Sequence, residues 1–228
     1  MEAISPQRRD ELLDALRRGT VPSSSLDLLA VGLEGFAPAL ESELEAVGAG
    51  RGMLKAVRGE YGSGKTFFAR WFQERARRRG FASSEVQVSE TETPLHRLET
   101  IYRRLVENLL TSDSRFGALR SIIDGWFYTL EEEVLQDRGS PLPDESDLIE
   151  RTDVLMERRL QQVTRQAPAF AACLRGYRWA LATEEHEIAE GLLAWLSGLP
   201  NVAARIKRQA GIKGNSDHSG PTASCGSF

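Results

Sequence analysis

The segment from Gly59 to Thr66, Gly-Glu-Tyr-Gly-Ser-Gly-Lys-Thr, has the residue types needed to wrap a chain of phosphate groups. Its glycines permit unusual backbone dihedrals and let main-chain N–H groups approach an anion closely. Lys65 places an ammonium group near the β- and γ-phosphates, and Thr66 offers a hydroxyl group to Mg²⁺. This full match to the pattern G-x-x-x-x-G-K-[ST], known as Walker A, predicts a nucleoside triphosphate site. Its predicted contact residues are Gly59, Glu60, Tyr61, Gly62, Ser63, Gly64, Lys65 and Thr66.

The sequence on both sides of this loop fits the same interpretation. Residues 53–57 are apolar and bounded by glycines, which predicts a strand. Residues 66–79 show helical periodicity, and the start of this helix would point the positive end of its dipole at the anion. Residues 85–89 alternate in polarity, which predicts a second strand. The order strand, loop, helix, strand is that of a βαβ unit in an α/β fold.

Hydrolysis would also need an acidic residue after a buried apolar strand, to hold Mg²⁺. Of the three nearest matches, residues 122–124 have only two apolar residues and are followed by Gly125, whereas residues 126–132 and 148–150 lie in helical patterns. Glu131 or Glu132 could be a metal ligand, but a solvated helix face is the favoured interpretation. Because no Asn-Lys-x-Asp motif for guanine is present, the predicted ligand is ATP with Mg²⁺. Turnover of ATP by this chain is not predicted.

The remaining sequence is mainly helical in pattern. Helices are predicted at 6–18, 36–47, 116–136, 147–164, 168–182 and 184–196, and another is predicted to begin at Pro94 with Thr93 as its N-cap. Residues 139–143 are a predicted linker, and residues 214–228 carry almost no apolar side chains, which predicts disorder. The sequence thus divides into four predicted segments: an N-terminal helical segment at 1–52, the βαβ unit at 53–92, a helical region at 93–213 and the tail at 214–228.

Composition excludes several other classes of protein. The chain has 228 residues, a formal net charge of −4 and 41% hydrophobic residues, so no overall basic surplus points to nucleic acid. Two cysteines and three distant histidines suggest neither a disulfide framework nor a metal cage. With no signal peptide at the start and no run of about 20 apolar residues, we expect a cytoplasmic protein without membrane contact.

Two basic clusters leave alternatives open. The first contains Arg75, Arg77, Arg78 and Arg79 at the end of a predicted helix, and the second contains Arg205, Lys207, Arg208 and Lys213. The favoured interpretation of the first is that it complements the helix dipole. The alternatives are contact with the DNA backbone or a lid over bound phosphate.

Several segments resemble the ATP-binding proteins of BREX bacteriophage-defence systems. They are Arg-Arg-Gly-Thr-Val-Pro at 17–22, Leu-Ala-Val-Gly-Leu at 29–33, the loop itself, Thr-Pro-Leu-His-Arg-Leu at 93–98 and Ile-Tyr-Arg-Arg-Leu at 101–105. The resemblance covers about Ile4 to Gly211. Many NTPases share the loop, so the other segments carry most of the specificity.

The resemblance implies an AAA-like P-loop core of three layers with a large, mainly helical C-terminal region. It also implies that Val31 and Gly32 touch the adenine; a buried turn before the next helix is the alternative. Contacts with other defence-system proteins would be expected, and an oligomer is compatible with the sequence. Two further hypotheses stay open, namely a regulatory ATP switch of the signalling type and a small P-loop kinase.

Family members are longer, and their acidic metal-binding strand follows the helical region. We therefore expect an incomplete core that lacks this Walker B part, and a segment at 214–228 that is foreign to the family. In AAA-like sheets the strand before the loop pairs with later strands. Residues 53–57 would then have unpaired edges, which predicts low stability or dependence on a partner.

Overall fold

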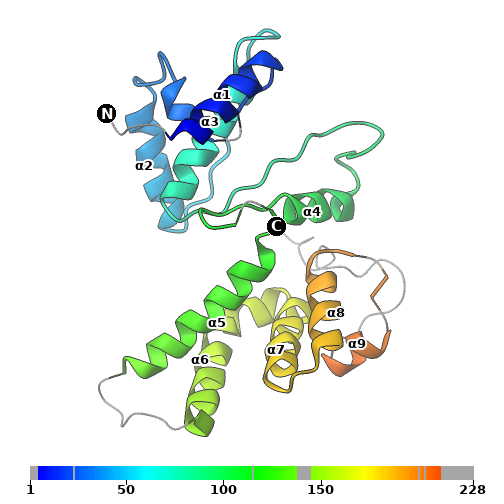
Figure 1. Cartoon of the computed structure of the whole chain (residues 1–228). Coiled ribbons are helices and arrows are strands. Elements are labelled where there is room, and N and C mark those ends of the chain that lie inside the picture. Colours follow the sequence, from blue (N-terminus) through cyan, green and yellow to red (C-terminus); the bar gives the residue numbers. More distant parts are fainter. Residues whose placement is uncertain are drawn as a thin grey trace. The chain divides into compact units, whose positions relative to one another are not determined.

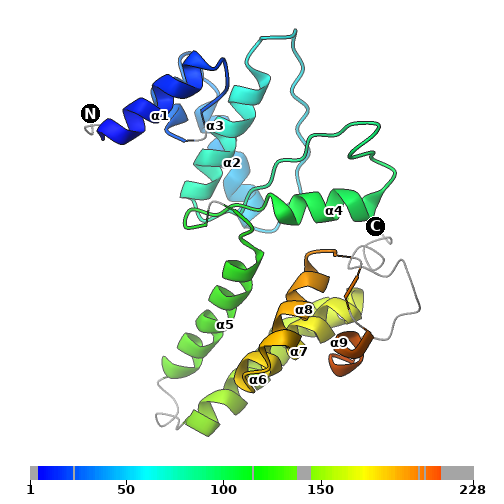
Figure 2. The same cartoon turned by 45° about the vertical axis from the view of Figure 1, so that its right-hand side comes forward.

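The computed structural model describes residues 5–22, 24–114, 116–137, 145–199, 201–202 and 204–211. The chain divides into two compact units, one ending at Ser83 and the other beginning at Ser84. Both are built from helices and connecting loops (Figures 1 and 2). We call them unit 1 and unit 2 and describe each by itself.

Unit 1 consists of α1 (Pro6–Arg17), the short 3-10 helix η1 (Leu26–Leu28), α2 (Ala37–Gly48) and α3 (Lys65–Arg78). Among its described residues the main buried cluster is small and consists of Leu26, Leu40 and Trp71, with partly buried apolar residues packed against it. Trp71 is 2% exposed and is the largest of these side chains. The stability of unit 1 therefore depends strongly on one aromatic residue of α3.

Unit 2 contains α4 (Leu98–Glu107), α5 (Leu119–Leu135), α6 (Glu145–Gln166), α7 (Pro168–Ala182), α8 (His186–Leu196) and α9 (Ala204–Gln209). Its larger core is formed mainly by α5 to α8, and α7 and α8 lie side by side in Figures 1 and 2. At its centre the hydroxyl group of Tyr177 donates a hydrogen bond to Asp124 (2.9 Å). Burial, together with this hydrogen bond, raises the pKa of Tyr177 to about 12.

Two glycines let the C-terminal part of unit 2 pack closely on α7 and α8. A Cβ atom at Gly191 would overlap the Cδ1 atom of Ile206 in α9 and lie 3.2 Å from its Cγ2 atom. A Cβ atom at Gly176 would lie 2.9 Å from the Cβ atom of Ala210. Larger residues at these positions would force the end of the helical region away from the core.

We expect Gly191→Ala to lower the free energy of unfolding of unit 2 by about 1–3 kcal/mol, because the added methyl group must displace Ile206. Gly125→Ala in α5 is the matched control, since a Cβ atom there meets no neighbour within 4 Å. Gly125→Ala should leave the free energy of unfolding unchanged or raise it by up to about 1 kcal/mol, because alanine favours a helix. Denaturant unfolding of both variants measures this, and equal midpoints would contradict the close packing of α9.

The predicted α/β fold with a three-layer core is wrong, because the described residues form no sheet. Residues 53–57 are extended but exposed, with Leu54 99% exposed. No backbone hydrogen bond joins them to another described segment. Residues 85–89 also form no strand. The physical reason is that an apolar, alternating segment becomes a strand only when another segment satisfies its main-chain groups.

The helix predictions were more accurate. The helices at 6–18, 36–47, 66–79, 116–136, 147–164, 168–182 and 184–196 are confirmed as α1, α2, α3, α5, α6, α7 and α8, with small shifts at their ends. The predicted start at Pro94 is wrong, because α4 begins at Leu98 while Thr93 and Pro94 lie buried in the turns before it. The linker at 139–143, Lys213 and the tail at 214–228 lie outside the described residues, and the division into four segments stays a prediction.

Candidate functional site

The predicted phosphate loop lies directly before α3, and Lys65 is the first residue of that helix. Gly62 and Gly64 have φ angles of +79° and +84°, the left-handed region that glycine adopts readily. The N–H group of Ser63 donates to the carbonyl oxygen of Glu60 (3.2 Å), which closes a turn inside the loop. Residues 59–64 are thus an ordered, exposed turn and not a continuation of the helix.

The loop folds around the side chain of Lys65. Its Nζ atom donates hydrogen bonds to the carbonyl oxygens of Gly59 (2.9 Å) and Glu60 (2.7 Å). A Cβ atom at Gly59 would lie 2.5 Å from the Oγ atom of Ser63, so this turn has no room for a larger residue. The Thr66 side chain next to Lys65 is exposed and available for a ligand. An anion at the loop would meet an ammonium group that is already held in place.

The loop opens onto a cavity of about 710 Å³ within unit 1. One part of its lining is cationic, with Lys55, Arg58 and Lys65. The other part is apolar and comes from the segment before α2, from α2 and from α3: Leu29, Val31, Leu33, Phe36, Ala39, Leu40, Phe67 and Phe68. The volume of this cavity falls within the range of small-molecule sites in proteins, which is about 300–1,000 Å³. Such sites also combine an apolar lining with a few polar or charged groups.

Five of the sequence-predicted residues line this cavity, namely Gly59, Ser63, Gly64, Lys65 and Val31. Val31 is 89% exposed, so it is not part of a buried turn. Gly32, its neighbour, is not among the lining residues and has a φ angle of +81°. Gly62 and the exposed side chains of Glu60, Tyr61 and Thr66 also lie outside the lining.

The three cations of the cavity differ in their partners. Lys55 forms an ion pair with Glu43 of α2 (2.6 Å between Nζ and Oε2), so its charge is locally balanced. Lys65 is bound only to the neutral carbonyl oxygens of its own loop. Arg58 forms no hydrogen bond or ion pair with any residue in the described part of the chain. The cavity therefore carries two cations without a carboxylate partner, which favours an anionic ligand.

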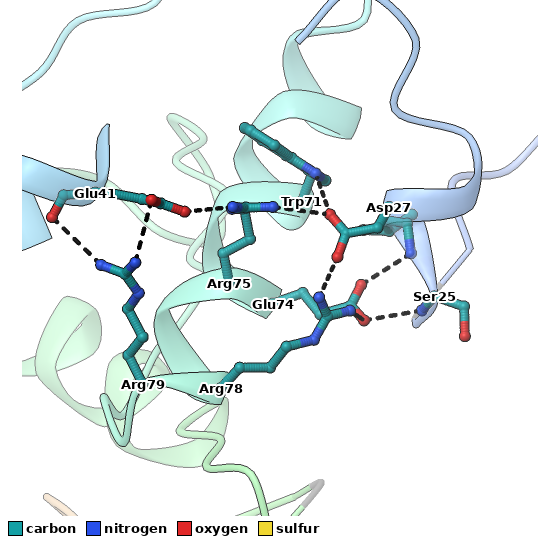
Figure 3. Close-up of polar contacts among 9 residues, drawn as sticks. Ser25, Asp27, Glu41, Trp71, Glu74, Arg75, Arg78 and Arg79 are labelled. Atoms are coloured by element: carbon teal, nitrogen blue, oxygen red, sulfur yellow. Dashed lines mark hydrogen bonds and ion pairs between the residues drawn. The ribbon is translucent and has the colours of Figure 1, made fainter. Parts of the chain in front are cut away.

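A polar network holds η1 against α3 and so positions the apolar lining before α2 (Figure 3). The indole N–H group of Trp71 donates to the Oδ1 atom of Asp27 (2.7 Å). The carboxylate of Glu74 accepts from the backbone N–H groups of Ser25 (3.0 Å) and Leu26 (2.9 Å). These bonds satisfy the main chain at the start of η1, which leads into the segment that contains Val31.

Three arginines of the first basic cluster belong to the same network, whereas Arg77 donates to the Oγ atom of Ser83 (2.7 Å). Arg75 pairs with Asp27 (3.3 Å) and Glu41, Arg78 pairs with Asp27 and Glu74, and Arg79 pairs with Glu41 (3.3 Å). Arg75 also lies over the ring of Trp71, 5.1 Å from its centroid. Asp27 and Glu41 could not be predicted as partners from the sequence, since no local pattern links them to arginines that lie 34 to 51 residues further along the chain.

The carboxyl group of Asp27 has a lowered pKa. Partial burial would raise this pKa, but hydrogen bonds from Arg78 and Trp71 and the nearby positive charges outweigh it. Because the folded-state pKa lies below the unfolded value of about 3.9, the stabilisation is complete above that pH and is lost as pH falls through the folded-state pKa.

We therefore expect Asp27→Asn to make unit 1 less stable at neutral pH but less sensitive to acid. Comparing thermal midpoints of the wild type and the variant at about pH 6 and about pH 3 tests this. The difference in thermal midpoint between the wild type and Asp27→Asn should be smaller at the lower pH. A gap that is constant across this range would show that the charge of Asp27 does not stabilise the network.

The carboxylates considered as metal ligands in the sequence serve other contacts in unit 2. Asp124 accepts from Tyr177, and Glu131 accepts from Arg178 (3.1 Å), which links α5 to α7. Glu132 accepts a hydrogen bond from Tyr128. Across the described ranges, no group of three His, Cys, Asp or Glu side chains is arranged to hold a metal ion.

A glycine-rich loop that feeds a helix and opens onto a partly cationic, partly apolar cavity fits a protein that binds a nucleotide. Residues 4–223 match the family of the BREX system ATP-binding protein BrxC/D, and the chain belongs to this family. The predicted resemblance is confirmed, and the match extends past Gly211 into the segment expected to be foreign to the family. No curated protein and no solved structure matches the chain.

Among the helices that the structure describes, none has the length and apolarity needed to cross a lipid bilayer.

Proposed function

We propose that this chain binds ATP together with Mg²⁺ through residues 59–66, as a component of a BREX-type defence system. The observation that carries this proposal is the position of Lys65, whose ammonium group lies in the loop that lines the cavity. The family of the chain is described as ATP-binding, which supports ATP as the ligand.

In this proposal the phosphates bind the exposed main-chain N–H groups between Gly59 and Lys65, at the N-terminus of α3. The Lys65 ammonium exchanges the two carbonyl oxygens it now contacts for phosphate oxygens, which carry full negative charge and accept stronger hydrogen bonds. Thr66 provides the hydroxyl ligand of Mg²⁺. The adenine lies at the apolar part of the cavity, near Val31 and Gly32.

The ion pairs of Arg75, Arg78 and Arg79 favour the loop over the basic cluster as the anion site. Each of these three guanidinium groups has a carboxylate partner in unit 1, so binding DNA or covering a phosphate would require breaking existing contacts. We propose that the chain acts with other proteins of the defence system, and that these proteins respond to the binding of nucleotide by this chain.

Titration calorimetry of the wild type with ATP tests the proposal, in the presence of Mg²⁺ and again with EDTA. We expect saturable binding of one ATP, weakened about tenfold by EDTA, which corresponds to roughly 1.4 kcal/mol. Thr66→Ala should lose most of this dependence on Mg²⁺. Thr91→Ala, a substitution of an exposed threonine in unit 2, is the control and should retain it. Absence of ATP binding to the folded wild type would refute the function.

A further inference from the structure

One aromatic ring of the cavity lies outside the buried cluster of unit 1. Phe36 lies immediately before α2 and lines the cavity, yet it is 59% exposed. Phe67 and Phe68 line the same cavity but pack against the buried cluster of Leu26, Leu40 and Trp71, to which Phe36 does not belong. Core packing therefore does not explain a phenylalanine at this position.

The backbone holds Phe36 firmly although its ring is exposed. Its N–H group donates to the carbonyl oxygen of Leu33 (3.0 Å), and its own carbonyl oxygen accepts from the N–H group of Leu40 (3.1 Å). Because the backbone at this position is already fixed, only the two side-chain torsions of the ring lose freedom when a ligand covers it. A flat, exposed aromatic ring on a fixed backbone is suited to stacking.

The remainder of the lining indicates what kind of ligand would stack there. The cavity that contains Phe36 also contains Arg58 and Lys65, two cations without carboxylate partners. A ligand that uses both parts must carry an aromatic ring at one end and several negative charges at the other. A nucleoside polyphosphate has this form, whereas an inorganic polyphosphate has only the charged part.

We propose that Phe36 is the base-stacking residue of this cavity and that it makes the site select a nucleoside polyphosphate over a bare polyphosphate. This inference rests on the proposed binding of a polyphosphate at residues 59–66. Stacking of a base on an aromatic side chain typically contributes about 1–3 kcal/mol, as judged by alanine substitution, so it can determine the preference. The cationic residues bind the phosphates of either ligand and cannot distinguish between them.

The test compares ATP with inorganic tripolyphosphate, both with Mg²⁺, on the full chain. Phe36→Ala should weaken ATP binding about tenfold or more and leave the affinity for tripolyphosphate unchanged. Phe36→Trp keeps an aromatic face and should restore ATP binding. The matched control is Phe116→Ala, which removes an 87% exposed phenylalanine from unit 2 and should change neither affinity.

Each other outcome has a definite meaning. If Phe36→Ala weakens the binding of ATP and of tripolyphosphate equally, the ring supports the fold of the loop and the stacking role is refuted. If the substitution changes neither affinity while the wild type binds ATP, the stacking role fails but the proposed function stands. If the folded wild type binds neither ligand, both proposals fail together.

Discussion

Replacing Lys65 by alanine is expected to weaken ATP binding by at least about a hundredfold, or roughly 2.7 kcal/mol. The ammonium group is the one cation placed inside the predicted phosphate loop, and hydrogen bonds to charged groups contribute about 1.5–3 kcal/mol each. In the structure it contacts only the carbonyl oxygens of Gly59 and Glu60 on an exposed turn. The substitution should therefore leave the fold of unit 1 intact, as thermal unfolding would show.

Lys55→Ala provides the matched control for this experiment. Lys55 lines the same cavity and carries the same charge, but Glu43 balances it. We expect its removal to change the affinity for ATP by no more than about threefold, the scale of a surface ion pair. Equal affinity of the wild type and Lys65→Ala would refute the assignment of the loop, whichever result the control gives.

A second large effect is expected from Trp71→Ala, which should lower the free energy of unfolding of unit 1 by about 3–5 kcal/mol. Trp71 is 2% exposed, fills the centre of a small core and donates its indole N–H group to Asp27. Removing it leaves a cavity between η1 and α3 and takes one hydrogen bond from the Oδ1 atom of Asp27, which keeps its contact with Arg75. The same change should weaken ATP binding, since η1 leads into the segment that carries Val31.

Denaturant unfolding and hydrogen exchange of the amides of α3 would measure this effect. Trp71→Phe keeps one six-membered ring but loses the N–H donor and part of the buried volume, so we expect a smaller loss of about 1–3 kcal/mol. Trp179→Ala in α7 is the surface control, because that tryptophan is 44% exposed. If Trp71→Ala lowered the free energy of unfolding no more than Trp179→Ala, the core assigned to unit 1 would be incorrect.

The helices of this protein could be predicted because the information that specifies them is local. Apolar residues at helical spacing identified α3 and α7 to within one residue at each end, and the loop was identified by its glycines, Lys65 and Thr66. α4 was placed too early because Thr93 and Pro94 resemble a helix start, whereas the structure buries them before the helix.

Features that depend on distant parts of the chain could not be predicted in this way. A strand at 53–57 needs a second segment that no local pattern can supply, and none of the described residues supplies it. The ion pairs between Asp27 and Arg78 join positions 51 residues apart. Val31 was predicted as a site residue only because of the family resemblance. Phe36 was not predicted, and its role became apparent only from its position in the lining of the cavity.

The open main chain at 53–57 also has a consequence for handling the isolated protein. Leu54 and its apolar neighbours present free N–H and C=O groups in an extended conformation, so identical copies can pair along this edge and form intermolecular sheets. Self-association should accordingly rise with protein concentration. A cognate polypeptide that supplied a complementary strand would suppress it and act as a chaperone for this segment.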